Sequence, residues 1–207
     1  WNFDEPVADE ITFALWIYGA EDADYTEPAQ IFDSTGEGIQ PIAYLFRRQS
    51  IDPEGTLDFR AATDRVIWNT ARDNNPMTES DYKGQWTHYT LVKDAGANDG
   101  EGYLRMYRNG ELVAENDSGQ ETAVDDFDIA AKRGELKHAY EGRMYDLRVY
   151  DYALSQAEIL HVAGNTGSVT IPLPTAAVGS DLEEDSVIDF KDLKLLTSDW
   201  LDAQLWP

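Results

Sequence analysis

The stretch Tyr140–Gly164, YEGRMYDLRVYDYALSQAEILHVAG, carries the patterns that decide the fold of this chain. In its first part, apolar or aromatic residues alternate with polar or basic ones. Successive side chains of a strand point to opposite faces, so alternation in period two indicates a strand with one buried face. The pattern predicts a half-buried strand over 143–150, with one face formed by Tyr145, Leu147 and Val149 and the other by Met144, Asp146, Arg148 and Tyr150.

A short helix is predicted directly after this strand. Ser155 is followed three residues later by Glu158 and then by an apolar run. Ser-x-x-Glu is a capping box, in which the two side chains bond to backbone N–H groups that have no partner at a helix start. Gly164 is typical of the residue that ends a helix, because glycine adopts the left-handed conformation without strain.

The rest of the chain up to this stretch consists of short alternating segments and polar turns. Asn109-Gly110 separates two such segments, and Asn-Gly is the strongest short-range hairpin signal because type I′ turns need positive φ at both centre residues. Many short strands with a single helix predict an antiparallel all-β sandwich. Ile11–Tyr18 is apolar on both faces, which is typical of a central strand. The predicted core includes Trp16, Trp86, Leu104, Leu147 and Val149.

The run from Gly142, G-x-x-x-D-L-R-V-Y-D-Y-A-L-S-x-A-E-I, resembles the last strand and closing helix of bacterial laminin-G-like domains. These domains belong to the concanavalin A-like lectin/glucanase superfamily. Three further segments match in the expected order: ITFALWIY at Ile11–Tyr18, GQWTHYTLVKD at Gly84–Asp94 and GYLRMYRNGELV at Gly102–Val113. The resemblance covers residues 1–163 and implies a jelly roll of two curved sheets. It implies less about function, because one fold hosts many activities.

The chain departs from this family at its start. Members usually have a further segment before the strand that corresponds to Ile11–Tyr18, whereas only Trp1–Glu10 stands there in this chain. We therefore expect that an edge strand is missing or is supplied by a neighbour. An open sheet edge invites pairing with another chain, so we also expect self-association.

Composition excludes several classes of partner. The 207 residues carry a formal net charge of −24 and no cysteine. Such a charge repels nucleic acids and anionic membranes. No segment approaches the ~20 apolar residues of a membrane span, and no disulfide or thiol chemistry is available. We expect an extracellular or cell-surface location, which the family resemblance implies.

Composition changes sharply near the C-terminus. Residues 164–180 (GNTGSVTIPLPTAAVGS) are uncharged and rich in Gly, Ser, Thr and Pro, which predicts a linker. Residues 181–207 then form a small loop-helix appendage, in which acidic side chains stand at positions 1, 3, 5, 9 and 12 of a twelve-residue loop. Ca²⁺ needs 6–8 oxygen ligands, and an EF-hand-type loop supplies them at this spacing with a backbone carbonyl at position 7. The predicted calcium ligands are Asp181, Glu183, Asp185, Val187 (carbonyl), Asp189 and Asp192.

This appendage resembles half of a dockerin module of the kind that ends proteins of planctomycete-type bacteria. Ser186 stands where the loop normally has Gly, and there is one repeat where cohesin-binding dockerins have two. Cohesin docking is therefore not expected. Two interpretations stay open: a bound Ca²⁺, or a metal-free segment that packs through Trp200, Leu201, Leu205 and Trp206.

The sequence contains no recognised catalytic motif, and its many isolated carboxylates leave a catalytic pair open as an alternative. Glucanases of the superfamily carry Glu-x-Asp-x-x-Glu on one strand, and no such run exists here. His88 is predicted to be a structural residue of a sheet, and Trp68 and Tyr107 to pack in the fold although both could stack on sugars. We expect a non-catalytic binding or adhesion module whose ligand is a carbohydrate or a protein. The alternatives are a structural subunit of a self-assembling cell-surface filament or matrix and, less favoured, a glycoside hydrolase.

Overall fold

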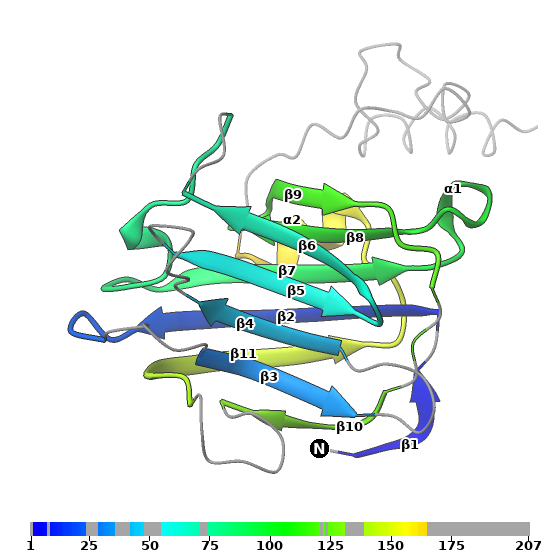
Figure 1. The fold of residues 1–207 in the computed structure, drawn as a ribbon, viewed down its shortest axis with the longest axis horizontal. Helices are drawn as coiled ribbons and strands as arrows, with labels where there is room; N and C mark the ends of the chain where they lie inside the picture. Colours follow the sequence, from blue (N-terminus) through cyan, green and yellow to red (C-terminus); the bar gives the residue numbers. More distant parts are fainter. Residues whose placement is uncertain are drawn as a thin grey trace, which may run out of the picture. The chain divides into compact units, whose positions relative to one another are not determined.

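A computed structural model describes residues 2–7, 9–23, 29–35, 42–47, 55–70, 74–120, 122, 124–130 and 139–164. In this part of the chain, two antiparallel sheets lie face to face (Figure 1). The six-stranded sheet has the order β1 (Asn2–Val7), β10 (Val124–Ile129), β3 (Ala29–Thr35), β4 (Ile42–Arg47), β5 (Thr56–Ala61) and β6 (Asp64–Asn69). The five-stranded sheet has the order β11 (Gly142–Tyr150), β2 (Glu10–Gly19), β7 (Thr87–Asp94), β8 (Tyr103–Arg108) and β9 (Glu111–Asn116). The predicted all-β jelly-roll sandwich is confirmed.

Helical segments are short and lie outside the sheets. They are a 3-10 turn at Glu79–Asp81, α1 at Ala97–Gly100 and α2 at Gln156–Val162. None of the helices among the described residues is long and apolar enough to cross a membrane.

The core lies between the two sheets. β2, paired with β11 and β7, turns Phe13 and Leu15 inward with no measurable exposure, as expected for a central strand. The ring of Phe13 stacks on Phe32 of the opposite sheet with centroids 4.4 Å apart. Leu104 is fully buried, as predicted. Each such side chain stabilises the fold by about 1.5–3 kcal/mol relative to an exposed position.

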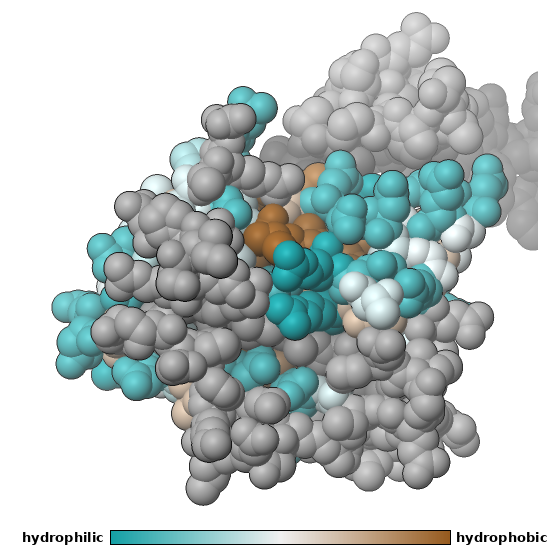
Figure 2. Space-filling view, in the orientation of Figure 1, coloured by the Kyte–Doolittle hydropathy of each residue, from teal (hydrophilic) through white to brown (hydrophobic). Residues whose placement is uncertain are grey.

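The two outer faces of the sandwich differ. The face of the six-stranded sheet is mostly hydrophilic where described residues are visible, with a small hydrophobic area (Figure 2). The outer face of the five-stranded sheet is partly covered by α2, which lies behind β7 and β8 in Figure 1. Ile159 of α2 is fully buried against Val92 and Tyr107 of these strands.

The start and end of α2 agree with the sequence. Ser155 caps the helix, and its side chain and that of Glu158 form the predicted capping box. The helix ends before Gly164, which has a φ of +77°. The capping box therefore fixes where the helix begins.

A β-bulge in β11 corrects the predicted faces of this strand. Asp146 and Leu147 stand opposite one residue of β2, between the pairs Tyr145↔Trp16 and Arg148↔Ala14. Asp146 has a φ of 52°, the left-handed conformation that favours glycine. The extra residue reverses the alternation, because a shift by one residue moves side chains to the opposite face. Leu147 and Val149 thus pack partly buried against the core together with Met144, while Tyr145 points outward and is 67% exposed.

The predicted absence of a leading edge strand is wrong. Residues Asn2–Val7 form β1, which pairs antiparallel with β10 at Asn2↔Asp126 and Val7↔Val124. The lead is short but extended, and it forms one edge strand of the six-stranded sheet among the described residues. The self-association inferred from a missing strand loses this argument and stays an untested prediction.

The predictions for the C-terminal part lie outside the described residues. This holds for residues 165–180 of the predicted linker 164–180 and for all six predicted calcium ligands, Asp181, Glu183, Asp185, Val187, Asp189 and Asp192. Calcium binding therefore stays a prediction of the sequence.

Candidate functional site

An exposed aromatic surface lies on the part of the five-stranded sheet that α2 leaves uncovered. It is formed by Tyr18 of β2, Trp86 just before β7 and Tyr145 of β11. The Trp86 ring lies 5.7 Å from that of Tyr18 and 6.4 Å from that of Tyr145, measured between centroids. Trp86 is 42% exposed, so its predicted burial in the core is wrong. Contiguous exposed rings on a folded domain are typical of a binding surface.

Register explains why these rings meet. Tyr145 pairs with Trp16 across the β11–β2 ladder, and Trp16 pairs with His88 across the β2–β7 ladder. Directly paired residues point to the same face of a sheet. Tyr18 lies two residues after Trp16, and Trp86 lies two residues before His88. Both therefore point to the same face as these residues.

His88 forms the floor beside the aromatic surface. Its ring makes an edge contact with Trp16 at 5.1 Å and is 2% exposed. Burial lowers the pKa of His88 to about 4, with a smaller opposing effect of Asp146 and a further lowering by Arg148. A neutral, buried ring fits the predicted structural role of this histidine.

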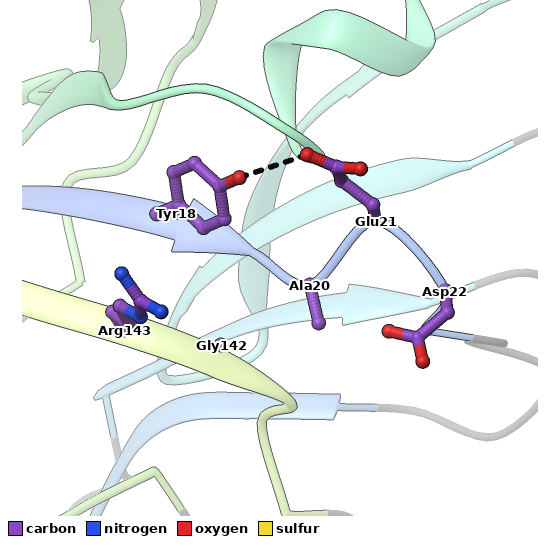
Figure 3. A pocket seen from close by; sticks show the side chains of 6 residues that line it. All are labelled: Tyr18, Ala20, Glu21, Asp22, Gly142 and Arg143. Atoms are coloured by element: carbon purple, nitrogen blue, oxygen red, sulfur yellow. Dashed lines mark hydrogen bonds between the residues drawn. The ribbon is translucent and has the colours of Figure 1, made fainter.

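A shallow pocket of about 450 Å³ adjoins the aromatic surface (Figure 3). It is lined by Tyr18, Ala20, Glu21, Asp22, Gly142 and Arg143. The volume lies within the range of small-molecule sites. The pocket therefore extends the aromatic surface at the turn that follows β2.

Polar groups surround Tyr18 within this pocket. Its hydroxyl donates a hydrogen bond of 3.1 Å to Glu21 Oε1, and the Arg143 guanidinium lies over its ring at 5.6 Å (Figure 3). The hydrogen bond to Glu21 raises the pKa of Tyr18, because only the protonated hydroxyl can donate it. The site thus offers apolar ring faces next to both hydrogen-bond donors and acceptors.

An ion pair lies at the bulge beside the site. Arg148 Nε and Nη2 donate to the two carboxylate oxygens of Asp146 at 2.9 and 2.6 Å. These bonds hold the pKa of Asp146 below its usual value. The bidentate geometry holds the two side chains together at the surface of the bulge.

The aromatic residues that the sequence suggested as sugar contacts lie elsewhere. Trp68 is fully buried and donates from Nε1 to the Asn75 carbonyl at 2.7 Å. Tyr107 is 5% exposed and packs in the cluster beneath α2. Their predicted packing role is therefore confirmed. Among the described residues, no three His, Asp or Glu side chains gather where they could hold a metal ion.

The sequence did not distinguish the exposed rings of the aromatic surface from buried rings. Tyr18, Trp86 and Tyr145 each lie in a segment of alternating residues, but buried and exposed rings look alike in such a pattern. Glu21 and Asp22 lie in the turn after β2, and both residues are exposed. Their position beside Tyr18 depends on the fold.

Comparisons with known proteins support the architecture. Residues 3–160 match the laminin-G model described as concanavalin A-like lectin/glucanases superfamily. A protein of Bacteroides ovatus ATCC 8483, which its name proposes to be carbohydrate-binding, matches with a TM-score of 0.55 and 18% identity over 76% of this chain and 41% of that one. The botulinum neurotoxin serotype D ligand binding domain in complex with N-acetylneuraminic acid matches with a TM-score of 0.55 and 15% identity over 80% of this chain and 38% of that one. At such identities the likeness concerns the fold alone. No curated protein matches the sequence.

Proposed function

Because the chain belongs to the concanavalin A-like lectin/glucanase superfamily, we propose that it is a non-catalytic carbohydrate-binding module. The observation that carries the proposal is the aromatic surface of Tyr18, Trp86 and Tyr145 beside a polar pocket. A sugar ring has an apolar C–H face and a rim of hydroxyl groups. This surface offers a matching combination, since flat rings can stack on the C–H face while Glu21, Asp22 and Arg143 reach the hydroxyl groups.

Other structures of this fold are consistent with binding. The Bacteroides ovatus protein is named for carbohydrate binding, and the neurotoxin domains are named for receptor or ligand binding. This chain corresponds to 36–41% of the length of those chains. Their ligands therefore suggest a class of activity for this chain and no particular sugar.

A non-catalytic role agrees with the sequence. The Glu-x-Asp-x-x-Glu run of the superfamily's glucanases is absent. Glycoside hydrolysis requires an acid and a nucleophile or base held on either side of one glycosidic bond. We propose an extracellular or cell-surface setting, where polymeric carbohydrate is accessible.

A glycan array with the purified protein tests the proposal, followed by calorimetry with the best ligand. Trp86→Ala and Tyr145→Ala should each weaken binding about tenfold, which corresponds to ~1.4 kcal/mol of lost stacking. Tyr152→Ala is the matched control, because Tyr152 is 42% exposed and hydrogen-bonds Glu158, next to α2. Its affinity should equal that of the wild type.

Two results would contradict the proposal. Glycan binding that survives the loss of both Trp86 and Tyr145 would place the ligand elsewhere. Sustained release of sugar from the bound glycan, abolished by a single carboxylate substitution, would identify a hydrolase instead.

A further inference from the structure

We propose that the site selects uncharged glycans and rejects sugars that carry carboxylate or sulfate groups. The inference rests on the proposed carbohydrate-binding function and concerns the class of sugar that the pocket accepts. It is carried by the identity and placement of the charged groups beside the aromatic surface.

The pocket itself has a negative balance. Its lining contains two carboxylates, Glu21 and Asp22, and one guanidinium, Arg143, all exposed to solvent. The nearby Asp146 carboxylate is matched by Arg148 in a pair of hydrogen bonds, so this pair adds no net charge. An anionic sugar placed on the rings would therefore meet more negative than positive charge.

Glu21 is held at the junction of pocket and rings. Its Oε1 accepts from the Tyr18 hydroxyl, and its side chain lies against Gly84, where an added Cβ would come within 3.4 Å of Glu21 Cγ. A carboxylate has about four acceptor positions, so one phenol leaves capacity for ligand hydroxyls. Vicinal hydroxyl groups of a neutral sugar can donate to it, whereas a ligand carboxylate cannot.

Arg143 does not reverse this preference. Its guanidinium lies over the Tyr18 ring at 5.6 Å, where the ring face attracts it. Its N–H donors can still bond to neutral sugar oxygens at the pocket edge. The whole chain adds to the local effect, because a net charge of −24 repels anionic polymers before contact.

The experiment uses the full chain and an array that carries neutral, sialylated, uronate and sulfated glycans, read at low and high NaCl. Neutral glycans should give the signals, with affinities that change little with salt. Carboxylated analogues of the same backbone should bind weaker by roughly fivefold or more, as expected for like charges at contact distance in water.

A charge-neutralised variant makes the test specific. Glu21→Gln combined with Asp22→Asn should bring the affinity for the carboxylated analogue closer to that for the neutral one. Glu101→Gln combined with Asp117→Asn is the matched control, since it removes the same charge from exposed positions near the opposite end of β7. The control should retain the wild-type preference.

The outcomes separate this inference from the function on which it rests. Strong binding of anionic glycans by wild-type protein, abolished by Trp86→Ala, would overturn the preference and leave carbohydrate binding in place. An unchanged preference in the Glu21→Gln/Asp22→Asn variant would also overturn it. Binding of no glycan at all would refute the proposed function and the preference together.

Discussion

His88 shows how burial sets the protonation of a single side chain beside the site. In the folded protein the pKa of His88 is lowered to about 4, whereas an unfolded chain has a value near 6.5. Below pH 6.5 His88 is protonated in the unfolded chain, whereas in the folded protein it stays neutral down to about pH 4. Stability from the neutral His88 is therefore present above pH 6.5 and is lost as the pH falls toward 4.

Urea unfolding at pH 7 and pH 5 checks this expectation. Wild-type protein should lose more unfolding free energy over this step than His88→Gln, by on the order of 1 kcal/mol. His161→Gln, on the exposed side of α2, is the control. Equal pH dependence of wild type and His88→Gln would show that His88 takes up its proton in the folded state as readily as in the unfolded one.

Individual aromatic residues could be assigned to strands from the sequence but not to the site. Trp68 and Trp86 occur in similar alternating segments, yet one is fully buried and the other 42% exposed. The difference arises because Trp68 points between the sheets and Trp86 points to the part of the outer face that α2 leaves open. No local pattern encodes where a helix from the end of the domain will lie.

Strands and turns were predicted well wherever the signal is local. Asn109-Gly110 forms the β8–β9 turn, with φ values of 50° and 86°, because its turn type demands these residues. The capping box at Ser155 likewise starts α2. The bulge at Asp146 gave no local signal, since an extra residue changes the alternation only in relation to the partner strand.

The bulge gives a prediction for β11. Asp146→Gly should keep the unfolding free energy within about 1 kcal/mol, because relief of the left-handed strain offsets loss of an exposed ion pair. Asp146→Val should cost about 1–3 kcal/mol, since a β-branched residue is strained at positive φ. Urea denaturation measures both changes.

Ligand binding provides the second readout for these variants. Asp146→Gly should retain glycan affinity, because Tyr145 stays on the outer face. Asp146→Val should weaken glycan binding, because strain in β11 would displace Tyr145. If valine were tolerated as well as glycine in both measurements, the left-handed bulge would be absent from the protein in solution.

The net charge of the whole chain affects the stability of its folded state. A net charge of −24 on 207 residues makes carboxylates repel one another in the compact state. Raising NaCl from 10 mM to 150 mM shortens the Debye length from about 30 Å to about 8 Å. We expect the melting temperature to rise by about 2–5 °C over this range, measured by calorimetry. A melting temperature that falls with salt would show that attractive pairs outweigh the repulsion.

Calcium should act beyond this general screening if the C-terminal loop binds it, as we propose from the sequence. At equal ionic strength, CaCl₂ should give one more bound ion for the wild type than for Asp181→Ala/Asp192→Ala in titration calorimetry. The mutated residues are the first and last positions of the loop. Equal stoichiometry for the two proteins would leave packing as the role of this segment.

The bulge in β11 also bears on how copies of this protein meet. β11 is an edge strand of its sheet among the described residues. The unpaired backbone N–H and C=O groups of an edge strand can pair with a strand of another chain. A kinked ladder with a left-handed residue and a charged pair is a poor template for such addition. We therefore expect this border of the sheet, next to the aromatic surface, to resist strand addition, so that assembly through the sheet edges of the described residues would use β1, β6 or β9.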